Sequence, residues 1–177
     1  FKNLSKNISA RQVNFSRHYE FLSQYKEFFA LPVQNPNCET GWLAFPMIIK
    51  DGSPFSRTDL QIFLEKRNIQ TRVVFTGNIL RQPGYKNITC IGKADDFVNA
   101  DRVMRGGILL AVHHGLNDEM LDHISVVVYT LSLMIYPFRY LFETCSLTSI
   151  VLIIQMIAVV IYVSYKSEII AKGLKHD

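Results

Sequence analysis

The chain has 177 residues, of which 49% are apolar and 19% charged, and its formal net charge is +4. This length allows one domain with a real hydrophobic core, and this composition excludes disordered, collagen-like and low-complexity proteins. Lysine and arginine form no dense basic stripe, so nucleic-acid binding is not expected. The mean hydropathy of +0.13 is high for a soluble domain, and the excess lies near the C-terminus.

The first third of the chain predicts a helix followed by a strand. Apolar residues at helical spacing predict an amphipathic helix over about 7–28, which Leu31 and Pro32 end. The apolar run 42–49 predicts a strand. Pro46 interrupts it, which indicates an edge or bulged strand because proline cannot donate a ladder hydrogen bond.

A second helix is indicated after a turn at residues 51–52. Ser56 and Asp59 have the spacing of a capping box, with Asp in place of Glu. Asn68 is placed to end this helix. The apolar residues of its predicted buried face are Leu60, Phe63 and Leu64.

Two more strands and two more helices complete the predicted unit. Strands are expected at 72–75 and 108–112, and a short helix at 95–104 that Gly106 and Gly107 stop. Asn117 is placed to cap a last helix. One face of that helix carries Met120, Leu121, Ile124, Val127 and Val128. The order predicts a small α/β layer, a few-stranded sheet with flanking helices, rather than a doubly wound domain.

The C-terminal part differs in composition. The 22 residues 144–165 carry no charge, which is long enough for a transmembrane helix, and lysines follow as in a cytoplasmic flank. The uncharged stretch 124–138 is short for a span and could equally be the end of a buried helix.

No complete catalytic set is visible. The sequence has no P-loop, no dinucleotide-binding glycine pattern and no nucleophile elbow. Cys38, Cys90 and Cys145 are far apart and indicate neither a zinc site nor a disulfide framework, so a reducing compartment is the default. His113 and His114 are adjacent, and in a strand they would point to opposite faces rather than bind one metal. No metal site is expected.

Three polar loops could hold an anionic or sugar ligand. In loop 75–83, Gly77 permits a close backbone approach, Asn78 and Gln82 offer donors and acceptors, and Arg81 can bind phosphate as a fork. In loop 101–107, Arg105 precedes two glycines. Loop 113–117, which includes His114, leads into a helix N-terminus. A solvated polar turn explains each loop as well.

Several motifs occur in one order that resembles a known family. The segments GWLAFP (41–46), FSRTDL (55–60), IQTR (69–72) and GNILRQP (77–83) resemble the C-terminal region of the sugar-nucleotide aminotransferase-like (DegT/DnrJ/EryC/StrS) family. The segments DFVNADRVMRGG (96–107) and HHGL (113–116) resemble its 3-dehydrase branch, which acts on CDP-4-keto-6-deoxy-D-glucose in lipopolysaccharide biosynthesis. The resemblance covers roughly residues 9–127.

The resemblance implies a fold and a chemistry. Residues 1–128 would form the small C-terminal domain of an aspartate-aminotransferase type fold, and residues 129–177 an apolar helical tail. The full enzyme would use pyridoxamine or pyridoxal phosphate and an iron–sulfur cluster, with a CDP-sugar as substrate and an electron-transfer reductase as partner, and could be a homodimer. Its large domain would carry the coenzyme and cluster ligands, so we expect no catalytic residue in this chain. The substrate-binding candidates are Arg105, Asn78, Arg81 and His114.

Alternatives remain open at the sequence level. A sugar-nucleotide aminotransferase fragment is one, and a coenzyme-binding Lys in place of His would identify it. A non-catalytic, membrane-tethered module is another. The tail is either an anchor of a cytoplasmic domain to the inner membrane, or foreign sequence joined after about 125–128 by a frameshift or fusion. The replacement of the expected family ending favours the second history.

Overall fold

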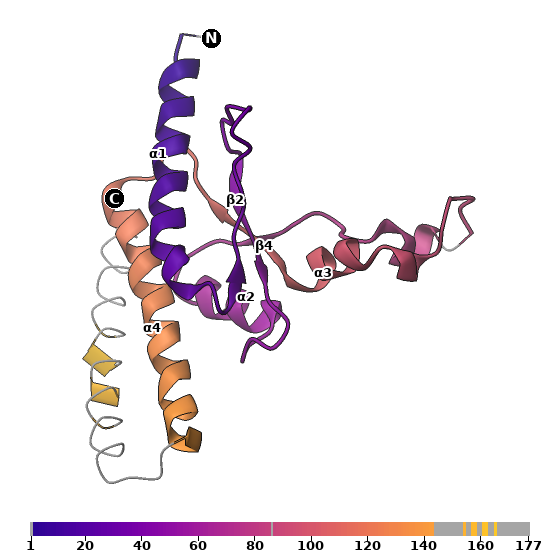
Figure 1. Cartoon of the computed structure of the whole chain (residues 1–177). Coiled ribbons are helices and arrows are strands. Elements are labelled where there is room, and N and C mark those ends of the chain that lie inside the picture. Colours follow the sequence, from indigo (N-terminus) through magenta and orange to yellow (C-terminus); the bar gives the residue numbers. More distant parts are fainter. Residues whose placement is uncertain are drawn as a thin grey trace. The chain divides into compact units, whose positions relative to one another are not determined.

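The computed structural model describes residues 2–85 and 87–143, the side chains only up to 135, and six isolated positions between 154 and 165. The helices are α1 (Leu4–Leu22), α2 (Arg57–Glu65), α3 (Val98–Gly106) and α4 (Asp118–Glu143). The strands are β1 (Phe29–Ala30), β2 (Ala44–Ile49), β3 (Arg72–Val73) and β4 (Gly107–Ala111) (Figure 1). The chain divides into two compact units, residues 1–62 with 70–116 and residues 63–69 with 117–177.

The first unit contains a four-stranded antiparallel sheet in the order β1-β2-β4-β3. The central pair joins Ala44 to Ala111 and Ile48 to Gly107 in register. Helices α1 and α3 contact this sheet. The predicted α/β class, a small sheet with flanking helices, is therefore confirmed.

One face of β2 packs against α1. Phe45 and Met47 alternate with less buried neighbours, so this face carries the core of the unit. The ring of Phe45 lies 4.9 Å from that of Phe15 and 5.6 Å from that of His18, measured between centroids. The Asn14 side chain donates to the carbonyl of His113 at 3.0 Å, which ties α1 to the chain just after β4.

The prediction that Pro46 marks an edge or bulged strand is wrong, because β2 is central in the sheet and Ala44–Ile48 pair one to one with β4. The backbone N–H of Lys50 donates to Phe28 at 2.8 Å, on the β1 side of β2. Alternation along the strand turns the nitrogen of Pro46 to that same side. β1 pairs only with Ile48 and Ile49, so no β1 ladder bond is lost at Pro46.

The predicted helix over 7–28 is also too long. α1 ends at Leu22, and the buried residues Phe28 and Phe29 enter the sheet edge instead. The carbonyl of Phe28 accepts from Ser53 Oγ at 3.1 Å, so tertiary pairing outweighs local helix periodicity here. The sequence therefore missed β1.

Two other boundaries shift. The strand expected over 72–75 is reduced to β3, because Phe75 has a positive φ of 47°. The helix expected over 95–104 is a 3₁₀ turn (Ala94–Asp96) followed by α3, and the chain enters β4 directly at Gly107.

The expected α2 signals are confirmed. The Ser56 backbone N–H donates to Asp59 Oδ2 at 2.9 Å, and Asp59 N–H donates back to Ser56 Oγ at 3.2 Å. The Ser56 hydroxyl also donates to Asp59 Oδ2 at 2.7 Å, and this bond, followed by the one from the Ser56 backbone N–H, lowers the pKa of Asp59. Asn68, with φ 61°, ends the turn after the helix. Leu60 and Leu64 are buried, and Phe63 is half-buried.

The second unit contains α4, which Asn117 caps as predicted, since its Oδ1 accepts from Met120 N–H at 2.9 Å. α4 continues through the predicted boundary at 128, and that boundary stays a prediction. Among the described residues, no helix is both long and apolar enough to cross a membrane. The candidate span 144–165 lies outside the described residues, apart from the isolated positions.

Candidate functional site

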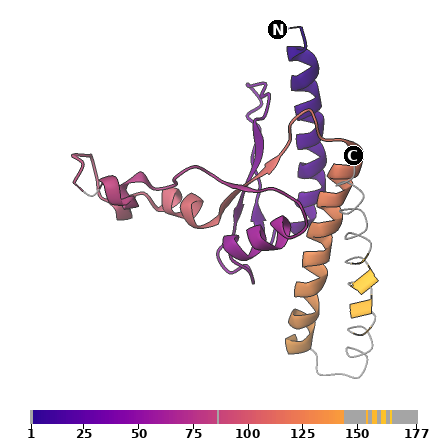
Figure 2. The same ribbon diagram turned by 180° about the vertical axis from the view of Figure 1, so that it is seen from behind.

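The chain leaves the sheet after β3 and returns at α3. Residues 74–97, which we call the arm, project away from the sheet in both views (Figures 1 and 2). The arm contains short 3₁₀ turns at Ile79–Arg81, Pro83–Tyr85 and Ala94–Asp96. Among its described residues, Asn78 is the only buried one.

Four polar side chains meet where the arm returns to α3. Asp101, in the first turn of α3, accepts from Arg81 Nε at Oδ1 and from Arg81 Nη2 at Oδ2, both at 2.6 Å. Asn78 Nδ2 donates to Asp101 Oδ1 at 2.8 Å and to the carbonyl of Ala94 at 2.9 Å. Arg81 Nη2 also reaches the exposed Asp95 at 2.7 Å. We call Asn78, Arg81, Asp95 and Asp101 the Asp101 cluster.

The electrostatics of the cluster keep its ions charged. Hydrogen bonds from Arg81, and then from Asn78, lower the pKa of Asp101 to about 2, although burial of the carboxylate opposes this shift. The two carboxylates raise the pKa of Arg81. Both members of the bidentate pair are therefore charged at neutral pH.

Arg105 lies one helical turn beyond Asp101 on α3, and its positive charge also lowers the pKa of Asp101. Its guanidinium is exposed and forms no hydrogen bond or ion pair with the described residues. Three of the four sequence candidates thus gather around Asp101, a residue that the sequence analysis did not single out. The available signal was an acid four residues before Arg105 on a predicted helix.

The arm touches α3 through backbone at Gly77. Its φ is +65°, and a Cβ added there would lie 2.3 Å from the Cβ of Met104. The expectation from the sequence that Gly77 lets a ligand approach the backbone stays a prediction; the close approach in the structure is to Met104 of α3.

Two further residues near the arm were missed. Phe75 has a left-handed backbone, which is unusual for a bulky residue, and its side chain is 82% exposed. Arg57 Nη1 donates to the carbonyl of Met104 at 2.7 Å, while its buried Nε has no partner among the described residues. Positive φ and a buried orphan donor are tertiary features that sequence patterns do not carry.

His114 lies elsewhere. It follows β4 at the end opposite to Arg105, so a five-residue strand of roughly 17 Å separates the two. His114 is exposed, and the neighbouring His113 Nδ1 accepts from Gly115 N–H at 3.1 Å. The structure therefore does not bring His114 to the Asp101 cluster.

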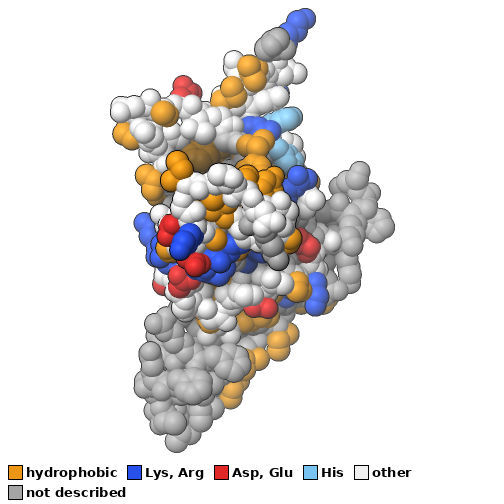
Figure 3. All heavy atoms as spheres, turned by 90° about the vertical axis from the view of Figure 1, so that its right-hand side faces the viewer, with side chains coloured by type: hydrophobic (Ala, Val, Ile, Leu, Met, Phe, Trp, Pro, Cys, Tyr) orange, Lys and Arg blue, Asp and Glu red, His pale blue; other side chains and the backbone are white. Residues whose placement is uncertain are grey.

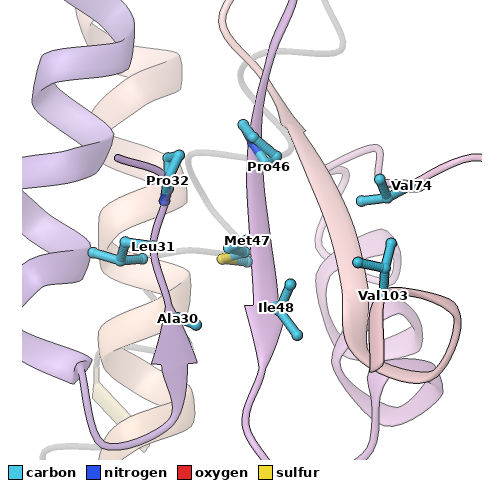
Figure 4. Close-up of a pocket in the computed structure, with 8 residues that line it drawn as sticks. All are labelled: Ala30, Leu31, Pro32, Pro46, Met47, Ile48, Val74 and Val103. Carbon is cyan, nitrogen blue, oxygen red and sulfur yellow. The ribbon is translucent and has the colours of Figure 1, made fainter. Parts of the chain in front are cut away.

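An apolar groove of about 240 Å³ lies beside β2 and the chain just after β1 (Figure 4). It is lined by Ala30, Leu31, Pro32, Pro46, Met47, Ile48, Val74 and Val103. None of these side chains ionises, so the groove offers no acid, base or nucleophile.

The described residues do not fit a metal or cluster site. They contain no group of three His, Cys, Asp or Glu side chains able to hold a metal ion, and Cys38 and Cys90 are exposed free thiols. Cys145 and His176 lie outside the described part. Every lysine whose side chain is described is exposed, so none offers a shielded amine to a coenzyme. On the face in Figure 3, Lys and Arg side chains lie beside Asp and Glu side chains.

Comparison with known proteins identifies the family. The model of the DegT/DnrJ/EryC1/StrS aminotransferase family matches residues 1–129. The lipopolysaccharide biosynthesis protein RfbH of Salmonella typhimurium is 32% identical over 117 residues, which are 66% of this chain and 26% of that protein. The dTDP-4-dehydro-2,6-dideoxy-D-glucose 3-dehydratase of Saccharopolyspora spinosa is 36% identical over 116 residues, 66% of this chain and 25% of that enzyme.

A solved structure agrees with these relatives. The E. coli GDP-4-keto-6-deoxy-D-mannose-3-dehydratase with bound hydrated PLP superimposes with a TM-score of 0.58 at 27% identity, over 71% of this chain and 32% of that one. The chain thus spans about a quarter of its curated relatives' length. It belongs to the DegT/DnrJ/EryC1/StrS aminotransferase family.

Proposed function

We propose that this chain forms the small C-terminal unit of a sugar-nucleotide 3-dehydratase that uses pyridoxal or pyridoxamine phosphate in deoxysugar biosynthesis. The observation that carries the proposal is the match, over the same part of the chain that holds the arm and α3, to proteins named as 3-dehydratases. One of these has been solved with bound PLP.

The chain's own contribution would be to bind and orient the substrate. Arg105 has a free guanidinium suited to the diphosphate of a nucleotide sugar, because its planar fork matches phosphate oxygens. Phe75 presents an exposed aromatic ring at the start of the arm. Asn78 and Arg81 already donate hydrogen bonds to Asp101, so fewer of their donors remain for a ligand. His114 would bind a separate part of the ligand.

The coenzyme would be held outside this matched region. When bound, it acts as the electron sink of the reaction. The exposed lysines described here do not supply its attachment point. The sequence resemblance also implies an iron–sulfur cluster and an electron-donating reductase. The ligands of the cluster would have to lie outside the described residues, which hold no group of side chains able to bind a metal ion.

The nucleoside is proposed as cytidine from the sequence resemblance, together with a role in lipopolysaccharide assembly. Two of the relatives above are named for a dTDP-sugar and a GDP-sugar, and the third is named for lipopolysaccharide biosynthesis. The test must therefore compare all three nucleosides.

Titration calorimetry of the full chain with CDP-glucose, dTDP-glucose and GDP-mannose tests this proposal. We expect CDP-glucose to bind most tightly, and Arg105→Ala to weaken it about 10- to 100-fold, the value of one charge-assisted hydrogen-bonding contact. Arg102→Ala is the matched control, since Arg102 is an exposed arginine on the same helix. Its Nε lies 3.8 Å from Asp51 Oδ2, a long and exposed ion pair. Absence of binding by all three ligands, or equal losses in both variants, would contradict the proposal.

A further inference from the structure

Apolar packing does not hold the arm in place. Its one buried residue among those described is the polar Asn78. Val74 and Leu80 are only half-buried, and six other large apolar side chains are exposed, namely Phe75, Ile79, Tyr85, Ile88, Ile91 and Phe97. Because burial of apolar surface is the main favourable contribution to folding, an arm that buries so little needs another restraint.

The polar contacts between the arm and α3 converge on one carboxylate. Both oxygens of Asp101 accept from Arg81, and Oδ1 also accepts from Asn78. Asp101 itself is 6% exposed. α3 is in turn fixed on the sheet, because a Cβ at Gly106 would lie 2.6 Å from the carbonyl oxygen of Ile49.

We propose that Asp101 is a positioning residue that fixes the arm on α3. By occupying donors of Asn78 and Arg81, it directs these side chains inward and leaves Arg105 as the guanidinium that meets the phosphates of a ligand. The statement about the arm stands on the hydrogen bonds alone, and the statement about Arg105 rests on the proposed function.

The hydrogen bonds of the Asp101 cluster predict how strongly different variants release the arm. Removing one partner of a buried ion pair leaves the other charge uncompensated, whereas removing both does not. Asp101→Asn removes the carboxylate that accepts from both Arg81 and Asn78, and it leaves the partly exposed guanidinium of Arg81 with only the exposed Asp95 as an ionic partner. This variant should therefore release the arm most. The double variant Arg81→Gln with Asp101→Asn removes both charges and should recover part of the restraint. Asp95→Asn removes only an exposed ion pair, because the Asp95 side chain is 87% exposed, and it should change the restraint on the arm little.

Amide hydrogen exchange of the full chain measures this directly. In Asp101→Asn we expect peptides of the arm to exchange at least 10-fold faster, while peptides of β2 and β4 keep their rates. Asp95→Asn should stay within twofold of the unchanged chain. The double variant should exchange more slowly in the arm than Asp101→Asn, a rescue that a merely disruptive substitution would not give.

Two results would overturn the role of Asp101: arm exchange within twofold of the unchanged protein, or acceleration of β2 and β4 by the same factor as the arm. Titration of Asp101→Asn with CDP-glucose tests the statement about Arg105 separately from the statement about the arm. A 5-fold or greater loss of affinity supports positioning of the site, and unchanged affinity with a released arm overturns it. If the unchanged chain binds no nucleotide sugar, the proposed function and the statement about Arg105 both fail, and the exchange result still decides the role of Asp101 in the arm.

Discussion

His18 shows how this chain satisfies a buried polar side chain. His18 is 2% exposed. Its Nε2 lies 3.0 Å from the carbonyl oxygen of Ala111, and because a carbonyl oxygen can only accept, the Nε2–H of the neutral ring donates to it. Burial lowers the pKa of His18, while the hydrogen bond to Ala111 opposes the shift. The imidazole therefore links α1 to the end of β4 in its neutral form.

This shift predicts a pH dependence of stability. The unfolded histidine binds a proton below about pH 6.5, and the folded one binds it only at lower pH. The contribution of His18 to the free energy of unfolding should thus be fully present above about pH 6.5. It should fall as the pH drops, by up to about 1.4 kcal/mol per pH unit, until the pH passes below the lowered pKa of the folded state. Urea unfolding at pH 8, 6.5 and 5 measures it. His18→Gln should flatten the dependence, and the exposed His114→Gln should not; the same slope in all three proteins would contradict this assignment.

Gly77 tests the backbone contact between the arm and α3. Alanine there meets both a positive φ and a collision with Met104, so we expect a loss of about 2 kcal/mol or more in the free energy of unfolding. Gly84→Ala is the control, because nothing lies within 4 Å of a Cβ at that position. Equal unfolding midpoints in urea for the two variants would show that the contact is absent.

The start of α2 gives a prediction at the scale of an element. Ser56 and Asp59 satisfy each other's backbone donors, so Ser56→Ala should cost about 1 kcal/mol in the free energy of unfolding. Thr58→Ala in the same turn should stay within about 0.5 kcal/mol, since its exposed side chain caps nothing. Thermal and urea unfolding of both variants measure the difference, and a Ser56→Ala protein as stable as Thr58→Ala would exclude a stabilising box.

Local signals of this kind were readable in the sequence. The capping box at Ser56, the left-handed Asn68 and the cap at Asn117 each depend on residues within four positions of one another. β1 was not readable because it depends on pairing with β2, about twenty residues later. The central position of β2 was not readable because it also depends on pairing with β4, about sixty residues later. The role of Asp101 could not be predicted from the sequence for the same reason, since its partner Arg81 lies twenty positions away.

At the scale of the whole molecule, the proposed function gives this chain the binding and orientation of a substrate. The chain covers about a quarter of its curated relatives, and its described residues hold neither a buried lysine nor a metal-binding group. The unit that is present supplies a sheet, α3 and an arm with a free guanidinium beside it. Binding and orientation of a substrate are the tasks that such a set of groups can perform.

A chimera tests the central claim most directly. Residues 1–129 of this chain would replace the matching segment of the E. coli GDP-4-keto-6-deoxy-D-mannose 3-dehydratase. Dehydration of both GDP-4-keto-6-deoxy-D-mannose and CDP-4-keto-6-deoxy-D-glucose would be measured after PLP loading is verified by absorbance. We predict turnover, and a loss of at least 10-fold in kcat/KM when Arg105→Ala is introduced but not when Arg102→Ala is. A folded, PLP-loaded chimera that forms no dehydration product would contradict the assignment of this chain to a 3-dehydratase.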